Sequence, residues 1–430
     1  MTRPFGYRAL ILPLLLWVLQ MLPTAAHAQE GNELLSPFAR GAGRTYSVTA
    51  RGLDAMGLNP ALLGLEAPRK VEFSIAPFLT LGLNAGPTLV HLQSIGKGFQ
   101  DTNLSSIAPA TTGTIGDSTR EAIVDFVKGD QLSSTLNTRL FGLALYDRDL
   151  GSFGLSASLH FALRTELPDS LVGYFGRSAE SNLAAQAVLG PTRVDIQGLA
   201  YAEYQLSYAR NLMGQLGSRD LQLRGGLSLN YYAGIDYMRV DPSSTFAFNF
   251  PRPMHGSSAL IAAHYSIQFA YPTSFGSDGL PQGFSLSPFT GGSAGSGIGA
   301  DLGLTMGVFD STGYSPWQAS ISVADIGSIT WSSNVKSRSV DTTVEVSTAD
   351  NLDIINSKVS ALAGTLDSSK SSFTSKLPTT LHLGGAIDLS AIGLTSNEVH
   401  YRAAAEYALG LTDVVGAPNH GRLGLAFVAT

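Results

Sequence analysis

The chain has 430 residues, a formal net charge of −6 and no cysteine, and 14% of its residues are charged. The negative charge excludes the basic face that nucleic-acid-binding proteins need, and the absence of cysteine excludes stabilisation by disulfides. The chain has 47 glycines, and its fraction of charged residues is low for a soluble protein of this length.

The N-terminus has the pattern of a secretory signal peptide. Arg3 and Arg8 precede an apolar stretch at residues 9–22, and residues 26–28 (AHA) form a small-residue cleavage site. The alternative, an uncleaved anchor, needs ~20 uninterrupted apolar residues, and Pro13 interrupts the stretch. We expect residues 1–28 to be removed on export. Beyond them no apolar run is long enough for a membrane helix, so this chain would enter a membrane as strands.

The first expected elements follow a flexible start. Residues 47–65 predict short helical turns that break at Asn59-Pro60. Alternating apolar residues predict a strand at 71–83, with a second near 87–93. After a loop rich in Ser, Thr and Gly, the capping pattern at residues 117–129 predicts a short helix.

Long alternating strands dominate the rest of the chain. Residues 140–151 and 152–164 predict a hairpin that turns at 147–149. The further strands are expected at 196–210, 223–237, 258–271, 297–309, 317–329, 379–390, 399–411 and 422–428, with a short helix at 168–176 and a polar excursion at 330–376 that contains a helix at 351–366. The total is about 12–14 strands, and no alternation of strands with crossover helices is present.

Strand length distinguishes two all-β architectures. Soluble strands cluster near ~5–6 residues, whereas tilted membrane strands need ~9–11. Here the alternating runs are longer than soluble strands, and short turns are expected at 147–150, 212–220 and 310–316. They alternate with long excursions at 93–137, 164–195, 238–257, 272–297 and 330–376. This asymmetry is typical of an outer-membrane β-barrel with short periplasmic turns and long external loops. A secreted β-sandwich is the alternative.

The strand at 223–237 illustrates the two expected faces. Leu227, Leu229, Tyr231 and Ile235 would contact lipid, whereas the residues between them would face the interior. Tyr237, at the end of this strand, is also expected on the lipid side, in an interfacial ring of aromatic residues. In several strands the alternate positions that carry the polar residues also carry small ones, among them Gly154, Gly226, Gly303 and Gly384. Such slim residues suit an interior that something else fills.

Ten ionisable residues are expected to face the interior: Glu72, His160, Arg164, Glu203, Arg224, Asp236, Asp301, His382, Arg402 and Glu406. Charges inside a barrel commonly pair as structural salt bridges, and a role in permeation is the alternative. An Arg224–Glu203 pair across neighbouring strands is one expectation.

Motifs for catalysis or cofactors are weak. Gly291 to Gly295 (GGSAG) match G-x-S-x-G, but Ser293 lies in a Gly/Ser-rich tract that leads into a strand instead of a helix. The eight histidines are scattered and form no zinc motif. We therefore expect no enzyme activity, no cofactor and no transition-metal site, while loose Ca²⁺ binding by external loops stays open.

Residues 50–65 (ARGLDAMGLNPALLGL) resemble the N-terminal segment of long-chain fatty acid transporters of the FadL type. The matching Asn-Pro-Ala-x-Leu motif comprises Asn59, Pro60, Ala61 and Leu63. Residues 297–306, 319–331 and 377–389 are similar to later strands of the FadL/PorV-like superfamily, so the resemblance covers most of the mature chain.

This resemblance implies an outer-membrane barrel of about 14 strands (69–430), with residues 29–68 as a plug inside the lumen. It implies that hydrophobic small molecules bind to the barrel or pass through it into the membrane lipid. PorV-like members instead serve protein secretion, so secretion-system proteins are the alternative partners. The chain departs from many outer-membrane proteins because Phe427 is followed by three further residues and the C-terminus is not aromatic.

Overall fold

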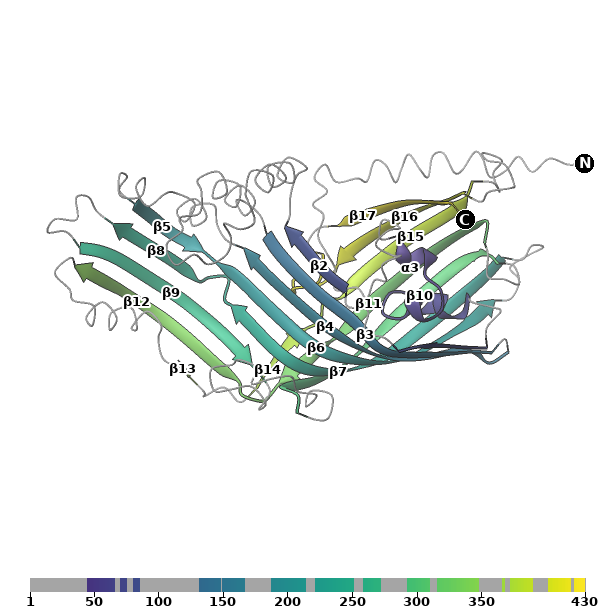
Figure 1. Ribbon diagram of the computed structural model, residues 1–430, viewed down its shortest axis with the longest axis horizontal. Helices are drawn as coiled ribbons and strands as arrows, with labels where there is room; N and C mark the ends of the chain where they lie inside the picture. Colours follow the sequence, from purple (N-terminus) through teal and green to yellow (C-terminus); the bar gives the residue numbers. More distant parts are fainter. Residues whose placement is uncertain are drawn as a thin grey trace, which may run out of the picture.

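The computed structural model is all-β, and its strands join one sheet in which every pairing is antiparallel (Figure 1). It describes residues 45–65, 70–75, 80–85, 131–147, 149–166, 187–213, 221–250, 258–271, 292–309, 315–347, 366–367, 372–389, 401–418 and 421–429. The signal peptide, residues 29–44, the strand at 87–93 and the helices at 117–129 and 168–176 lie outside these ranges. The helix expected at 351–366 also lies outside them except for Leu366, which belongs to the strand β13 (Leu366–Asp367). Among the described helices, none has the length and apolar character needed to cross a membrane.

The first described elements are three short helices: α3 (Tyr46–Thr49), η1 (Gly52–Ala55) and η2 (Pro60–Leu65). We call residues 45–65 the N-terminal segment. The expected break at Asn59-Pro60 is confirmed, because η2 begins at Pro60. Proline suits a first helical position, where no intrahelical partner awaits an N–H, and the Asn59 side chain accepts a hydrogen bond from the Ala61 N–H (3.1 Å).

Most strands form what we call the main sheet. Its neighbours, in order, are β1 (Val71–Ser74) and β2 (Thr80–Ala85), which share β3 (Gln131–Asp147), then β4 (Gly151–Glu166), β6 (Asp195–Met213), β7 (Leu221–Val240), β10 (Gly295–Val308), β11 (Trp317–Trp331), β14 (Phe373–Lys376) with β15 (Thr380–Asp388), β16 (Tyr401–Gly410) and β17 (Arg422–Ala429). The hairpin expected at 147–149 is confirmed as the β3–β4 turn.

A second group of strands, the extension, continues beyond one end of the main sheet (Figure 1, left). It comprises β5 (Ala187–Arg193), β8 (Thr245–Phe250), β9 (Ser258–Ala270), β12 (Lys336–Ser347) and the short β13 (Leu366–Asp367). The end of β9 pairs with the end of β7, which joins the extension to the main sheet. The excursions at 164–195, 238–257 and 330–376 were expected as loops, yet β5, β8 and β12 lie within them.

A tight turn carries the chain from β7 into β8. The Asp241 carboxylate accepts hydrogen bonds from the backbone N–H (2.8 Å) and the hydroxyl (2.6 Å) of Ser243. These bonds stabilise the ionised form and lower the pKa of the Asp241 carboxyl below its usual value. After this turn β8 continues along β9, so the pairing that β7 begins with β9 extends beyond the main sheet.

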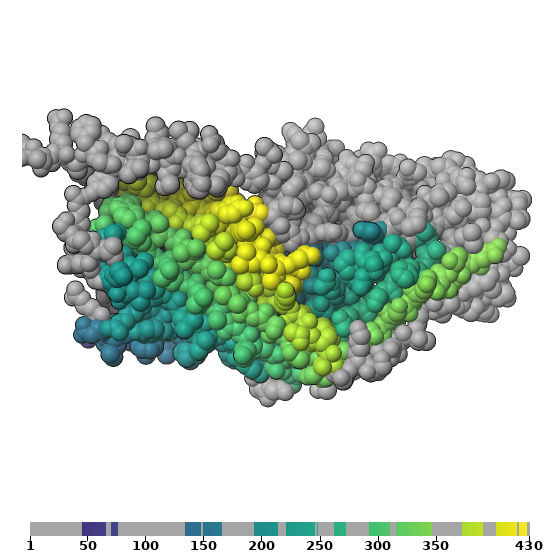
Figure 2. Space-filling view, turned by 180° about the vertical axis from the view of Figure 1, so that it is seen from behind, coloured from purple at the N-terminus to yellow at the C-terminus, as the bar shows by residue number. Residues whose placement is uncertain are grey.

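The outer face of the main sheet is apolar and exposed. Large apolar side chains stand open to the surroundings on successive strands: Phe73, Phe153, Leu155, Leu206, Leu227, Leu229, Tyr231, Ile298, Leu302, Leu304, Met306, Ile321, Leu383, Leu425 and Phe427. In Figure 2, β10, β11 and β15 to β17 run as diagonal bands from green to yellow across this surface. The expected outward positions of Leu227, Leu229 and Tyr231 are confirmed.

The inner face of the main sheet, against which the N-terminal segment packs, is polar and buried. Its buried side chains include Ser156, His160, Glu203, Gln205, Ser228, Asn230, Asp301, Thr305, Gln318, Ser320, His382 and Glu406. Soluble sheets normally bury the apolar face and expose the polar one. The main sheet has the opposite arrangement.

The extension follows the ordinary rule of soluble proteins. On β12 the side chains of Asp341, Thr343 and Glu345 are exposed, whereas Val340 and Val344 are buried. The polarity of the exposed residues therefore changes between the main sheet and the extension.

Candidate functional site

The N-terminal segment is buried against the inner face of the main sheet. Helix α3 contacts β11, β15 and β16, η1 contacts β1 and β3, and η2 contacts β4, β6, β7 and β10. Strands toward both edges of the main sheet, from β1 to β16, therefore contact this segment of 21 residues. The four residues of the Asn-Pro-Ala-x-Leu motif are all buried there.

Asn59 connects the two halves of the segment to the sheet. Its Nδ2 donates hydrogen bonds to the Ser47 carbonyl (3.0 Å) and the Thr305 hydroxyl (3.3 Å), while Oδ1 accepts from Ala61 (3.1 Å). The amide thus uses donors and acceptor at once, which suits a buried side chain. Pro60 and Ala61 lie against Gly226.

Glycines of the inner face lie where the segment approaches the sheet. A Cβ atom at Gly154 would lie 2.7 Å from the Met56 sulfur, and one at Gly384 would lie 2.8 Å from the Val48 Cβ. Cβ atoms at Gly226 and Gly303 would overlap the Pro60–Ala61 backbone and the Asn59 side chain, respectively. At these four positions the N-terminal segment therefore takes up the space that a side chain would need.

Charged side chains of the inner face hold the backbone of the segment. Glu72 accepts hydrogen bonds from the Leu53 N–H (3.1 Å) and the Tyr146 hydroxyl (2.6 Å). Arg224 donates to the Gly64 carbonyl and to Gln222. Glu406 accepts from the Ser47 N–H (2.8 Å) and lies 2.9 Å from His382 Nδ1.

Removal of the Glu406 carboxylate tests this anchor. Glu406→Ala removes the acceptor of the buried Ser47 N–H and the carboxylate beside His382 Nδ1, so we expect the free energy of unfolding to fall by about 2–5 kcal/mol. Glu406→Gln keeps an acceptor at the same place and is expected to cost less than half as much. Urea unfolding of the purified variants measures both values, and equal losses would contradict the anchoring role.

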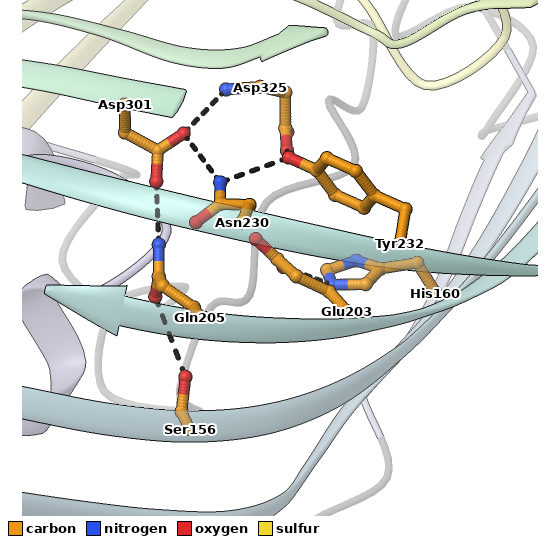
Figure 3. Close-up of polar contacts among 8 residues, drawn as sticks. All are labelled: Ser156, His160, Glu203, Gln205, Asn230, Tyr232, Asp301 and Asp325. Carbon is orange, nitrogen blue, oxygen red and sulfur yellow. Dashed lines mark hydrogen bonds and ion pairs between the residues drawn. The ribbon is translucent and has the colours of Figure 1, made fainter. Parts of the chain in front are cut away.

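A polar network crosses five strands beyond the N-terminal segment (Figure 3). Asp301 on β10 is its centre and accepts hydrogen bonds from Gln205 (2.6 Å), Asn230 (3.1 Å) and the Asp325 N–H (2.8 Å). Tyr232 receives a hydrogen bond from Asn230 (3.0 Å) and donates to Asp325 (3.3 Å). The network therefore ties β6, β7, β10 and β11 together across the inner face, and Ser156 links β4 to it through Gln205 (3.5 Å).

Two β-bulges shape the network. β11 carries an extra residue opposite Asp301, where Asp325 adopts φ 57°, a left-handed conformation that non-glycine residues rarely take. β7 carries an extra residue at Ile235. Bulges re-aim side chains, and this one gives Asp236 the register position of Ala200. Asp236 therefore turns to the outer face, which corrects the expectation that it faces the interior.

His160 and Glu203 form a buried pair beside the network. His160 Nε2 lies 2.9 Å from Glu203 Oε2, and the His160 ring stacks on Tyr201. The expected Arg224–Glu203 pair is wrong, because Arg224 lies opposite Asn211 whereas Glu203 lies opposite Tyr232. Along β6, Glu203 lies eight positions away from Asn211, the partner of Arg224.

The remaining predicted charges lie farther along the inner face. Arg164 contacts Asp195 (3.3 Å) and Asp413 (3.2 Å). Arg402 lies opposite Asp388 in the β15–β16 register. The structure thus divides the predicted set into anchors of the N-terminal segment, members of the network or its neighbours, and separate pairs.

A cluster of apolar side chains lies next to the polar network. We call it the apolar cluster; its large members are Leu199, Tyr201, Tyr232, Tyr237, Ile329, Trp331 and Leu377, joined by Val414 and Val415. The Tyr237 ring lies 5.4 Å from that of Trp331. Tyr237 was expected among the outward aromatics, and the bulge at Ile235 turns it inward instead.

Sequence reasoning missed Asp325, Tyr232, Gln205 and the Val414–Val415 pair as site residues. Tyr232, Gln205 and Asn230 occupy alternate positions on the polar face of their strands, so the alternation could have identified them as inward residues. Asp325 and the two valines had no such signal, because a bulge and a loop position them.

The described residues contain no group of three His, Asp or Glu side chains arranged to hold a metal ion. Ser293 is followed by β10 rather than a helix, so the strand–turn–helix geometry of a nucleophile elbow is not formed there.

Comparisons with known proteins give one match. No curated protein and no solved structure matches the chain. A family of unknown function, DUF5723, matches residues 64–417, which is most of the chain and includes nearly all of the described strands. The chain therefore belongs to the DUF5723 family.

Proposed function

We propose that the main sheet is the transmembrane wall of an outer-membrane β-barrel. The observation that carries this proposal is the arrangement of the main sheet, with exposed apolar side chains outside and buried polar ones inside. In water such a surface is costly, whereas in lipid it is the expected one. The signal peptide expected at residues 1–28 agrees with export to this membrane.

The extension then lies in water on the external side. Its exposed side chains are polar, as Asp341, Thr343 and Glu345 illustrate. Long external segments and short turns on the other side are typical of outer-membrane barrels. The change in exposed polarity between the two parts marks the edge of the lipid.

The N-terminal segment is the plug of this barrel. Its burial, its contacts with strands from both ends of the main sheet and the glycines beneath it support this assignment. The polar network spans the inner face next to it. With the N-terminal segment in this position, the lumen of the barrel is blocked.

The barrel binds hydrophobic small molecules or passes them toward the membrane lipid. The apolar cluster supports this function, since it places Tyr237, Ile329 and Trp331 on the inner face of an otherwise polar wall. Aromatic and aliphatic side chains beside a few convergent polar groups are typical of small-molecule sites. The resemblance of the Asn59–Leu63 motif to fatty acid transporters points the same way.

Asn59 provides a test of the plug. Asn59→Ala removes three hydrogen bonds inside the segment and to Thr305, so we expect the plug to loosen. Planar-bilayer recordings should then show channel openings that the parent chain lacks, and cells should become sensitive to large antibiotics. Unchanged conductance and sensitivity would contradict the plug role. Thr343→Ala, on the exposed face of the extension, is the control.

A second function is a PorV-like barrel that docks exported proteins without transport. The extension favours it, because a polar sheet that projects beyond the membrane offers a surface to a protein partner. Purification from detergent-solubilised membranes separates the two functions. A stoichiometric secretion partner supports docking, whereas a co-purified apolar molecule supports transport.

A further inference from the structure

The polar network and the pair beside it contain more carboxylates than basic side chains. Glu203 and Asp301 are buried and Asp325 is half-buried. The basic side chain that contacts them is His160, whose Nε2 lies 2.9 Å from Glu203 Oε2. Among the residues that the structure describes, no Lys or Arg forms an ion pair with any of the three carboxylates. The inner face therefore carries excess negative charge here, which is costly at a buried site.

Neutral donors compensate Asp301 but leave one oxygen of Glu203. Asp301 Oδ2 accepts a hydrogen bond from the Gln205 side chain (2.6 Å), and Oδ1 accepts from the Asn230 side chain (3.1 Å) and from a backbone N–H of β11 (2.8 Å). Glu203 is only 3% exposed, yet its Oε1 has no hydrogen-bond partner in the part of the chain that the structure describes. A buried polar atom of this kind requires an explanation, because most such atoms are hydrogen-bonded.

The Asn230 amide has a second buried oxygen of the same kind. Its Nδ2 donates to Asp301 Oδ1 (3.1 Å) and to the Tyr232 hydroxyl (3.0 Å), which fixes the orientation of the amide. Asn230 is 4% exposed, and its Oδ1 has no partner among the described residues. Glu203 lies opposite Tyr232, so Asn230 is its diagonal neighbour on the same face. In Figure 3 the free Glu203 oxygen points away from His160 and toward Asn230.

Two neighbouring buried acceptors need a positive group between them. We infer that Glu203 Oε1 and Asn230 Oδ1 bind an alkali-metal cation inside the barrel. Oxygens of carboxylates and side-chain amides are the ligands that hard cations take, and one carboxylate matches a single positive charge. The described residues gather no three His, Asp or Glu side chains around a metal ion, which disfavours a divalent one.

A cation at this position would stabilise the inner face. It would join β6 to β7 through Glu203 and Asn230, and it would reduce the repulsion between Glu203 and Asp301. Arg139 does not supply this charge, because it lies opposite Ser158, one strand away from Glu203, and contacts Asp54 (3.4 Å). The inference goes beyond the proposed function, since an ion is not a hydrophobic molecule and its binding requires no transport.

Binding of radioactive Na⁺ to the full chain purified in detergent tests the inference. With choline chloride keeping the ionic strength constant, we expect saturable binding of one ion per chain, and unlabelled K⁺ should compete. Glu203→Gln removes the charge while keeping the shape of the side chain, so it should abolish the binding. Glu345→Gln, which neutralises an exposed carboxylate of the extension, is the matched control and should bind Na⁺ like the parent chain.

A second measurement compares urea unfolding in NaCl and in choline chloride. A ligand that binds only the folded chain stabilises it, so Na⁺ should raise the unfolding midpoint of the parent chain and leave that of Glu203→Gln unchanged. In choline chloride, Glu203→Gln should be at least as stable as the parent chain, because it lacks the uncompensated charge.

Two results would overturn the inference. One is a folded parent chain that binds neither Na⁺ nor K⁺, and the other is binding that Glu203→Gln retains. A parent chain whose stability ignores Na⁺ but falls as the pH rises would show that a proton occupies Glu203 instead. Because binding in detergent does not depend on membrane insertion, each of these results is separable from the outcome for the proposed function.

Discussion

Replacement of Leu206 and Leu229 by arginine is expected to prevent stable folding in membranes. The two residues face each other across β6 and β7, and their side chains are 56% and 57% exposed. With Leu155, Tyr204 and Tyr231 they line a shallow apolar hollow of about 300 Å³ on the outer face. Arginine on the lipid face of a barrel costs about 2–4 kcal/mol per residue at the membrane midplane.

The same substitutions distinguish lipid from water outside the sheet. On a water-exposed surface, replacement of leucine usually changes stability by less than about 0.5 kcal/mol. The folded fraction is measured by heat-dependent migration on gels and by protease resistance of isolated outer membranes. Thr343→Arg, on the exposed face of β12, is the matched control and should fold normally. A Leu206/Leu229 double arginine variant that folds as well as this control contradicts the membrane assignment.

The second large effect is expected at Gly226. A Cβ at this position overlaps the backbone of Pro60 and Ala61, and backbone cannot move aside as a flexible side chain can. Gly226→Ala should therefore push the N-terminal segment off the wall, with a cost of about 1–3 kcal/mol typical of overpacked interiors. We expect new channel openings and cleavage of the segment by added protease.

A matched glycine substitution separates displacement from a general loss of stability. A Cβ at Gly385 has no neighbour closer than the Gln318 carbonyl oxygen at 4.0 Å, so Gly385→Ala should leave conductance and cleavage unchanged. Urea unfolding of the two variants shows whether the strands remain intact. If Gly226→Ala keeps the segment protected from protease and conducts no current, the close packing of the plug does not keep the barrel closed.

Local alternation explains why the central strands could be predicted. On β7, Leu227, Leu229 and Tyr231 point outward while Ser228 and Asn230 are buried. Each position depends only on the period of two in a strand, so no knowledge of distant residues is needed. The same rule identified Glu203, Asp301 and Glu406 as inward residues.

The prediction fails where the period is interrupted. The extra residue at Ile235 reverses the faces of Asp236 and Tyr237, and the extra residue in β11 directs Asp325 into the network. Neither bulge has a sequence signature here. The strands β5, β8 and β12 were missed for another reason. They lie within segments that were expected to be loops, because polar residues surround them.

The pairing of charges also depends on distant register. Arg224 and Glu203 share a face on neighbouring strands, but the β6–β7 register places Tyr232 opposite Glu203. Arg224 instead holds Gly64, and His160 meets Glu203 from β4. Sequence alone identified the charged residues of the interior without their partners.

The sequence by itself determined that this chain is built of long antiparallel strands with one polar and one apolar face, because strand periodicity is a local property. It also placed the helix break at Asn59-Pro60, which depends on proline chemistry alone. Only the tertiary structure decided what fills the concave face: the N-terminal segment on its glycines, the network around Asp301, and Val414 and Val415 in the apolar cluster. Most of those contacts join residues that lie between 24 and 359 positions apart, and bulges and register, which local sequence does not encode, decide which of them meet.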